Sequence, residues 1–179
     1  HARGDNSSGQ RTKTRKFTAF RPADARPRPH QDTDTPIQRY TYKQIKKLGF
    51  KCIEVSDYTG SKEILNGRVK TLHPKIFGGI LSRRNLNQDV EETKKFDIPL
   101  IDLVIVDLYP FEETVKSGGT ENEIIEKIDI GGIALIRAAG KNYKDVTCIS
   151  SKDDYVKFLE VYTKKDGALS IVDRKKFGS

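Results

Sequence analysis

The sequence predicts an α/β fold with a mainly parallel sheet, preceded by an irregular N-terminal tail. From Thr41 onward, segments with helical patterns alternate with short strand-like segments, which is typical of a parallel sheet covered by helices. The nearly unbroken apolar run at 100–106 indicates a strand that is buried on both faces. Residues 1–36 contain no Ile, Leu, Val or Met, so they have too little apolar surface to offset the entropy of ordering.

Capping residues and periodicity predict the individual elements. Thr41 is suited to cap a helix that stops at Gly49, and 50–55 then has the pattern of a strand. Further elements are expected as helices at 88–96, 121–128, 133–139 and 153–162, a strand at 146–149, and a last helix capped by Ser170. We therefore divide the chain into a basic tail rich in Pro, Ser and Thr at 1–40 and a domain at 41–179.

The net charge of +8 lies mostly in the tail. Residues 1–40 contain nine Lys or Arg and four Asp, a net charge of +5, so the domain at 41–179 is only mildly basic. Such a domain suits a small anionic ligand, for example a nucleotide, at least as well as a nucleic acid. RNA binding by the aromatic and basic stretch at 15–21 is an alternative hypothesis, which predicts an affinity that falls steeply with salt.

Several classes of protein and of site are not expected. No apolar run approaches the roughly 20 residues that cross a bilayer, and the N-terminus has no apolar signal-peptide centre. We therefore expect no membrane segment and a cytoplasmic location. Cys52 and Cys148 lie in apolar runs and are interpreted as buried free thiols. The three histidines are scattered, which predicts no metal site.

The exit of the apolar strand is a first candidate for a ligand site. Ligands of open parallel sheets bind at the carboxyl ends of the strands, and here Asp107, Tyr109 and Pro110 follow the run at 100–106. Pro110 excludes helical geometry at Tyr109 and ends the strand. A packed turn without a ligand explains this motif equally well.

A second candidate is the turn that contains Asp129 and Ile130. The glycine pair Gly131–Gly132 allows close approach of the backbone to a ligand, and the helix that follows presents N-terminal amides to anionic or carbonyl oxygens. A Gly-Gly turn before a helix is common, so the pair alone is weak evidence. Lys141 lies near the end of the same helix, where a lysine ordinarily complements the helix dipole.

The third candidate is the basic segment 68–75, which places four potential cations within eight residues. Arg68 and Lys70 alternate with Val69 and Thr71, as in a half-exposed extended segment with its cations on one side. Arg68 could bind a phosphate or carboxamide as a planar donor, and Lys70 as a point charge. A solvated basic loop is the alternative interpretation.

These segments resemble one enzyme family in their order. The motif Gly67-Arg68-Val69-Lys70-Thr71-Leu72-His73-Pro74, followed by Gly79-Ile80-Leu81, is similar to the signature of the IMP cyclohydrolase domain of the bifunctional AICAR transformylase/IMP cyclohydrolases. The segments that match the same family in register are 53–60, 108–111, 128–132 and 135–142. The resemblance extends over roughly Thr41 to Tyr155.

The resemblance implies a three-layer, methylglyoxal-synthase-like fold, a homodimer, and a reaction of purine nucleotide biosynthesis without a metal or cofactor. The substrate would be a purine nucleotide precursor, the formylated aminoimidazole carboxamide ribotide, which loses water and closes to inosine monophosphate. The implied catalytic residues are Lys70, Thr71, Tyr109, Asp129 and Lys141. The implied substrate-binding residues are Arg68, Val69, Lys70, Thr71, Asp107, Asp129 and Ile130.

The chain also departs from the family. Its members have loops similar to Ser-x-x-Asp-Lys-Thr-Gly and Ser-Thr-Gly-Gly-Thr, which help to hold the substrate phosphate and ribose, and neither is recognisable here. Asp107 stands where many members have Asn, and we expect no transformylase domain within these residues. An inactive nucleotide-binding or dimerisation module is therefore the alternative to an enzyme. The related methylglyoxal synthases and regulatory domains are a weaker alternative, because they lack the motif at 68–74.

Overall fold

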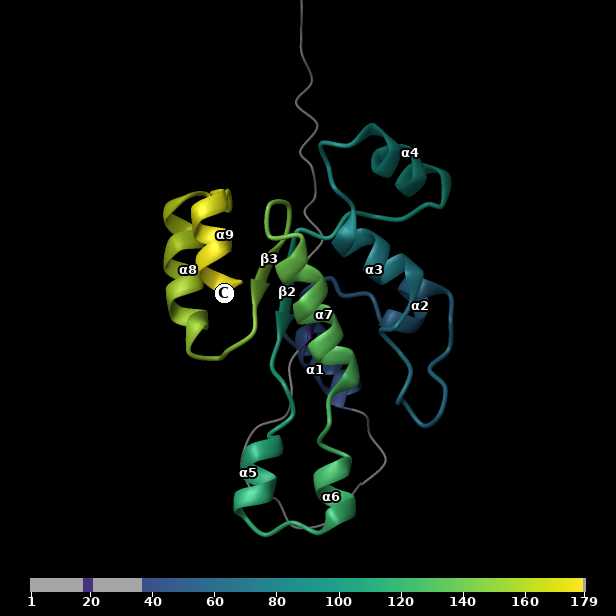
Figure 1. The fold of residues 1–179 in the computed structure, drawn as a ribbon, viewed down its shortest axis with the longest axis vertical. Helices are drawn as coiled ribbons and strands as arrows, with labels where there is room; N and C mark the ends of the chain where they lie inside the picture. Colours follow the sequence, from purple (N-terminus) through teal and green to yellow (C-terminus); the bar gives the residue numbers. More distant parts are fainter. Residues whose placement is uncertain (1–17, 21–36, 179) are drawn as a thin grey trace, which may run out of the picture.

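The computed structural model of the chain describes residues 18–20 and 37–178. The remainder of the predicted tail lies outside the described residues. In chain order the elements are β1 (Thr18–Phe20), α1 (Ile37–Lys47), α2 (Val55–Thr59), α3 (Pro74–Leu81), α4 (Asn87–Lys95), β2 (Leu103–Val106), α5 (Phe111–Lys116), α6 (Glu121–Ile125), α7 (Ile130–Lys141), β3 (Thr147–Ile149), α8 (Asp154–Lys164) and α9 (Ile171–Phe177) (Figure 1).

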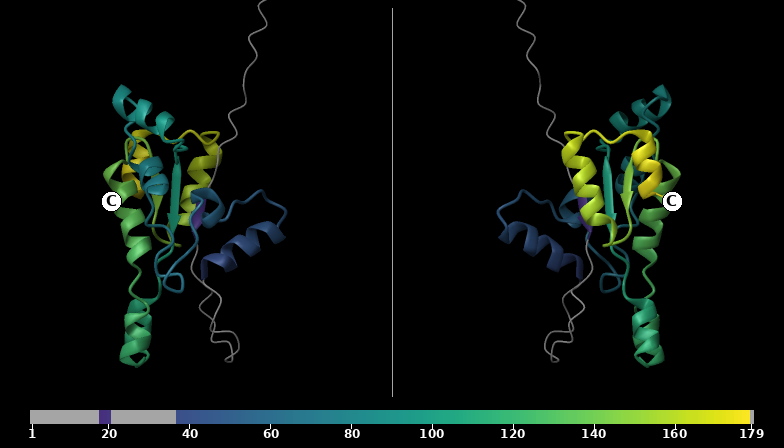
Figure 2. Two further views of the ribbon diagram at one scale, coloured as in Figure 1. Left: turned by 90° about the vertical axis from the view of Figure 1, so that its right-hand side faces the viewer. Right: turned by 90° about the vertical axis from the view of Figure 1, so that its left-hand side faces the viewer.

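Strands β1, β2 and β3 form a parallel sheet in that order, which confirms the predicted α/β class. Helices cover both faces of the sheet, with α3 and α7 on one side and α8 on the other (Figure 2). The sequence places the ends of α4, α8 and β3 within a few residues of their observed positions. At the last helix, Ser170 accepts a hydrogen bond from the backbone N–H of Asp173, which is the predicted cap.

The beginning of the chain differs from the prediction in two ways. Residues 18–20, predicted to be irregular, form β1 and pair with 104–106 of β2. Sheet pairing uses backbone groups, so a segment without Ile, Leu, Val or Met can still add a strand. In addition, α1 begins at Ile37, and Thr41 is therefore a buried residue inside the helix rather than its cap.

The segment 50–55 is not a strand, contrary to the prediction. Residues 50–54 have no regular structure, and α2 begins at Val55. A strand is stable only where its backbone groups are paired, and no strand among the described residues pairs with this segment. Instead, the Phe50 N–H donates to the carbonyl of Ile45 in α1, and the Phe50 side chain stays 67% exposed.

The core has two parts because successive side chains of β2 point to opposite faces. Val104 and Val106 belong to one cluster of buried residues, which includes Ile80 of α3 and Leu135 of α7. Leu103 belongs to the other cluster, whose remaining buried members are Ile149, Phe158 and Phe177. The sheet is thus packed against helices on both sides, as the apolar sequence of β2 predicts.

The connection from β2 to α7 brings two distant segments to one edge of the sheet. Between these elements the chain forms the arm, which we define as residues 110–128 with helices α5 and α6, and which projects from the body (Figure 1). The arm begins just after Tyr109 and ends just before Asp129. Both of these residues therefore lie where the arm joins the body.

No helix in the described ranges is long and apolar enough to span a bilayer. Both cysteines are free thiols. Cys148 is buried in β3, and burial raises the pKa of its thiol to about 11. Cys52 is only partly buried and lies outside the strands, so the prediction of a buried thiol in a strand holds for Cys148 alone.

Replacing Gly79 by alanine should destabilise the domain. A Cβ atom at Gly79 would lie 2.5 Å from the Pro99 carbonyl oxygen and 3.2 Å from Ile101, so α3 would have to move away from the chain that leads to β2. We expect a loss of about 1–3 kcal/mol in the free energy of unfolding, measured by urea denaturation.

Gly140→Ala is the matched control, because it also changes a helical glycine. The nearest atom to its added Cβ is the Gly178 carbonyl oxygen at 3.7 Å, an ordinary contact. The substitution should raise the free energy of unfolding by up to about 1 kcal/mol, since alanine has the higher helix propensity. Equal effects of the two substitutions would contradict the packing described for α3.

Candidate functional site

The candidate site lies at the carboxyl end of β2 and the N-terminus of α7. Asp129 is the N-cap of α7, and its Oδ1 accepts a hydrogen bond from the Gly132 N–H at 2.6 Å. Burial raises the pKa of this carboxyl, and the hydrogen bond from Gly132 lowers it by a smaller amount. Asp129 therefore holds a proton more tightly than an exposed aspartate does.

Tyr109 lies close to Asp129 although the arm separates the two in sequence. Burial raises the pKa of the Tyr109 hydroxyl, and the negative charge of Asp129 raises it further. The phenol is therefore neutral at physiological pH and can donate a hydrogen bond. The structure thus brings together two of the predicted catalytic residues, one from each end of the arm.

Thr71 is the third member of this cluster. The residue is only 3% exposed, and a Cβ atom built at Gly131 would lie 2.8 Å from the Thr71 hydroxyl oxygen. The absence of a side chain at Gly131 is what allows this hydroxyl to approach the first turn of α7. The neighbouring Ile130, in contrast, is 62% exposed beside the cluster.

Arg68 and Lys70 do not share one half-exposed side, so this prediction is wrong. The Arg68 side chain is 64% exposed and forms an ion pair with Glu126 of the arm. The Lys70 side chain is only 5% exposed. The difference arises because 65–68 form a tight turn before Val69, in which Leu65, Asn66 and Gly67 all have positive φ angles.

Lys70 lies between two carboxylates that the sequence analysis did not identify. Its Nζ is 3.1 Å from Glu63 Oε2 and 4.0 Å from Glu54 Oε1. The only signal in the sequence is indirect: a lysine among apolar residues, if buried, needs an opposite charge nearby. Which of the chain's many acidic residues supplies that charge depends on the tertiary structure.

Asp107 lies at the same edge of the sheet but faces α8. It is 7% exposed, and its Oδ1 accepts a hydrogen bond from the Tyr155 hydroxyl at 2.9 Å. Its Oδ2 is buried and has no hydrogen-bond partner among the described residues. Asp107 is therefore on the face of the sheet opposite to α7, with one carboxylate oxygen available to a donor.

Lys141 is not brought to the cluster. It is the last residue of α7, whereas Asp129 caps the first turn, and it is exposed. At a rise of about 1.5 Å per residue, the helix separates the two backbone positions by roughly 18 Å. The structure thus brings Thr71, Tyr109 and Asp129 to the N-terminus of α7. Lys70 precedes Thr71 in the chain and is paired with Glu63, and Lys141 lies at the far end of α7.

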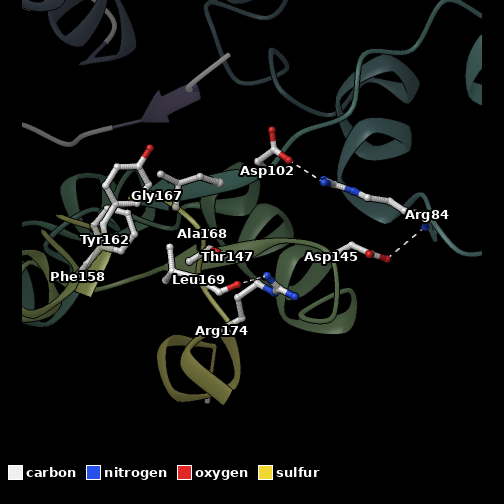
Figure 3. Close-up of a pocket in the computed structure, with 11 residues that line it drawn as sticks. Arg84, Asp102, Asp145, Thr147, Phe158, Tyr162, Gly167, Ala168, Leu169 and Arg174 are labelled. Carbon is white, nitrogen blue, oxygen red and sulfur yellow. Dashed lines mark hydrogen bonds and ion pairs between the residues drawn. The ribbon is translucent and has the colours of Figure 1, made fainter. Parts of the chain in front are cut away.

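A separate cavity of about 260 Å³ lies at the opposite edge of the sheet (Figure 3). Asp102, which precedes β2, and Thr147, the first residue of β3, line it together with Arg84 and Arg174. Arg84 donates to Asp102 at 2.7 Å, and the three guanidinium nitrogens of Arg174 donate to backbone carbonyls. Arg84 is thus ion-paired with Asp102, and the donors of Arg174 are satisfied by backbone carbonyls. The cavity contains none of the predicted site residues.

The described part of the chain has no cluster of three or more His, Cys, Asp or Glu side chains that could hold a metal ion. One Ser–His pair is present, in which Ser61 Oγ lies 3.2 Å from His73 Nε2. His73 Nδ1 accepts a hydrogen bond from the Lys75 N–H, so the proton of the neutral ring is on Nε2. This tautomer cannot take a proton from Ser61, and the pair is therefore not a nucleophile with its base.

Comparison with known proteins identifies the family to which the chain belongs. Residues 39–134 match the family model of the MGS-like domain, which is more than half of the chain. The chain belongs to the MGS-like domain family. A chain of the solved structure named "Crystal structure of ForH" is 31% identical to this MGS-like domain with a TM-score of 0.63, and the match covers 77% of this chain and 71% of that one.

Two relatives of this MGS-like domain carry the name "Bifunctional purine biosynthesis protein PurH". The protein of Bacteroides thetaiotaomicron is 56% identical over 131 residues, and that of Trichodesmium erythraeum is 52% identical over 137 residues. The matches cover 73% and 76% of this chain but only 26% of each relative. The chain therefore spans about a quarter of the length of these relatives, and the resemblance drawn from the sequence is confirmed over that part.

Replacing Asp129 by asparagine should increase the free energy of unfolding relative to the wild type, and this increase should be larger at neutral pH than at acid pH. A carboxyl with a raised pKa in the folded state binds its proton more tightly when folded, so its contribution to stability falls as the pH rises from about 3.9 through the folded pKa. Asparagine keeps the cap of α7 but does not titrate.

Urea denaturation of both proteins between about pH 3 and pH 7 measures this effect. The difference in unfolding free energy, Asp129→Asn minus wild type, should increase with pH and then level off. A difference that decreases with pH would mean that the folded state lowers the pKa of Asp129.

Proposed function

We propose that this MGS-like domain is the IMP cyclohydrolase part of a purine biosynthesis enzyme. The observation that supports it is the convergence of Thr71, Tyr109 and Asp129 at the N-terminus of α7, beside the buried Lys70. The names of the PurH relatives refer to purine biosynthesis. The proposed reaction is the closure of the formylated aminoimidazole carboxamide ribotide to inosine monophosphate.

The chemistry requires positioning and charge stabilisation. The carboxamide nitrogen of the substrate attacks its formyl carbon, which closes the ring; that nitrogen loses a proton and the formyl oxygen gains one. The resulting hydroxyl then leaves as water together with the proton of the nitrogen that carried the formyl group, and a C=N bond forms. An amide nitrogen is a poor nucleophile, so holding it against the formyl carbon is expected to supply much of the acceleration, up to about 7–11 kcal/mol in favourable cases. The reaction involves no change of oxidation state, and we propose no metal or cofactor for it.

The cluster offers groups suited to each of these tasks. In the proposed site, Lys70 and the Thr71 hydroxyl stabilise negative charge on the formyl oxygen. Tyr109, whose pKa is raised, stays protonated and donates a hydrogen bond or a proton to the departing water. Asp129, with its raised pKa, accepts the proton from the carboxamide nitrogen or orients that group.

Substrate binding would use the residues around this cluster. We propose that Arg68, Val69 and Ile130 contact the substrate where they flank the cluster. Asp107 has no substrate contact in this proposal, because it faces α8 on the other side of the sheet and both of its oxygens are buried or bonded there. Lys141 has no step in the mechanism, because α7 separates it from Asp129. A homodimer, as the family resemblance implies, and the cytoplasmic location expected from the sequence are also part of the proposal.

Turnover by the 179-residue chain tests the function directly. Inosine monophosphate formation from the formylated ribotide is followed by absorbance and chromatography for the wild type and for Lys70→Ala. We expect wild-type turnover at least about 100-fold above that of Lys70→Ala, the loss typical when a stabilising donor is removed. Lys141→Ala should differ little from wild type.

The alternative of an inactive module predicts a different result. Such a module would bind inosine monophosphate, or form dimers, while the wild type and Lys70→Ala both fail to produce the nucleotide. The absence of the two family loops that hold the phosphate and ribose favours this alternative. Calorimetric titration with inosine monophosphate, run on the same samples, separates an inactive nucleotide-binding module from a chain with no nucleotide site.

A further inference from the structure

The Lys70 side chain is much more deeply buried than the cations of the surface ion pairs. Its side chain is 5% exposed, whereas those of Arg68, Arg83 and Lys116 are more than 60% exposed in their ion pairs. A buried ammonium is costly unless an opposite charge compensates for its loss of water. The carboxylates beside Lys70 are thus a condition for burying this side chain.

Glu63 is the nearer of the two carboxylates, and the backbone explains why. Ile64 and Val69 form an antiparallel bridge, with hydrogen bonds of 3.2 and 3.3 Å between their backbone groups. In an antiparallel pair the next residues outward are also neighbours. The bridge therefore sets Glu63 opposite Lys70, and the Glu63 Oε2 to Lys70 Nζ distance is 3.1 Å.

Glu54 approaches Lys70 from a different element. It stands directly before α2, and its Oε1 is 4.0 Å from Lys70 Nζ, so its interaction is weaker than that of Glu63. Both carboxylates are largely buried, with 20% of Glu63 and 28% of Glu54 exposed. Both carboxylates are therefore part of the packed surroundings of Lys70 and do not belong to a solvated surface ion pair.

We propose that Glu63 is a positioning residue for the reaction proposed above, which acts by fixing the ammonium group of Lys70. This inference rests on the proposed function of Lys70. The next residue, Thr71, is anchored against Gly131 of α7. Lys70 is thus held by Glu63 on one side and by its neighbour's contact with α7 on the other, which fixes the ammonium relative to the Asp129 cluster.

The restraint that Glu63 places on the Lys70 ammonium group can be measured without any enzymatic activity, from the reactivity of the amine. Acetic anhydride acetylates accessible amines, and mass spectrometry gives the rate at Lys70 relative to the exposed Lys116 in the same sample. In the wild type, Lys70 should react far more slowly than Lys116. In Glu63→Gln the relative rate at Lys70 should rise by about tenfold or more, because a buried ion pair has lost one partner.

The kinetic constants kcat and KM test whether the ion pair between Glu63 and Lys70 matters for the reaction. Glu63→Gln should lower kcat by about 100-fold, the cost of a displacement of roughly 1 Å in an active site, while KM changes little. Glu63→Asp should recover part of kcat, because it restores the carboxylate at a shorter reach. Glu54→Gln, at the longer distance, should have a smaller effect than Glu63→Gln.

Glu112→Gln is the matched control, since it removes the carboxylate of an exposed ion pair with Lys116 in the arm. It should leave kcat unchanged, and also the labelling rate of Lys70 when that rate is taken relative to the exposed Lys94, since Lys116 loses its own partner in this variant. Circular dichroism and thermal unfolding are recorded for each variant, so that a loss of folding is not mistaken for a loss of positioning. In a Lys70→Ala background, Glu63→Gln should cause no further loss of kcat.

Two results would overturn the inference. One is unchanged labelling of Lys70 in a folded Glu63→Gln variant, which would mean that Glu63 does not hold the ammonium. The other is faster labelling with wild-type kcat, which would make the ion pair purely structural. If the wild type itself shows no turnover, the proposed function fails, and the labelling result still decides separately whether Glu63 holds Lys70.

Discussion

The structure of the site depends on the close approach of three segments to the first turn of α7. Thr71 contacts Gly131, and a Cβ atom at Gly132 would lie 2.5 Å from Asp129 Oδ2 and 2.9 Å from Leu108. Any larger side chain at either glycine would push apart the exit of β2, the segment around Thr71 and the cap of the helix. The paired glycines thus set the spacing of the candidate site, and the residues with chemical roles are arranged around that spacing.

Much of the layered fold could be predicted because its signals are local. The apolar sequence of β2 and the Ser170 cap of α9 each depend on a few neighbouring residues. The failures at 18–20 and 50–55 concern strands, whose formation depends on a partner distant in sequence. A sequence can show that 50–55 favours extended structure, but not whether a neighbouring strand is available to pair with it.

The candidate site likewise has features that could be predicted from the sequence and features that could not. Gly131, Asp129 and Tyr109 could be predicted, because the turn before a helix and the exit of a strand are visible as motifs. The opposite environments of Arg68 and Lys70 could not, since alternation alone places both on one side. The turn at 65–68 exposes Arg68 to the arm and buries Lys70 against Glu63. Burial of a charge is decided by tertiary neighbours, which no local pattern records.

The arm has a consequence for how this domain can vary. Residues 110–128 leave the body after Tyr109 and return to it before Asp129. The arm is therefore a long loop, and both of its ends lie at the same cluster. The entropy of closing such a loop grows only with the logarithm of its length, by about 0.6 kcal/mol per doubling. Insertions and deletions at the tip of the arm should therefore have little effect on the positions of Tyr109 and Asp129. The length of the arm can therefore change while the chemistry at its base is preserved.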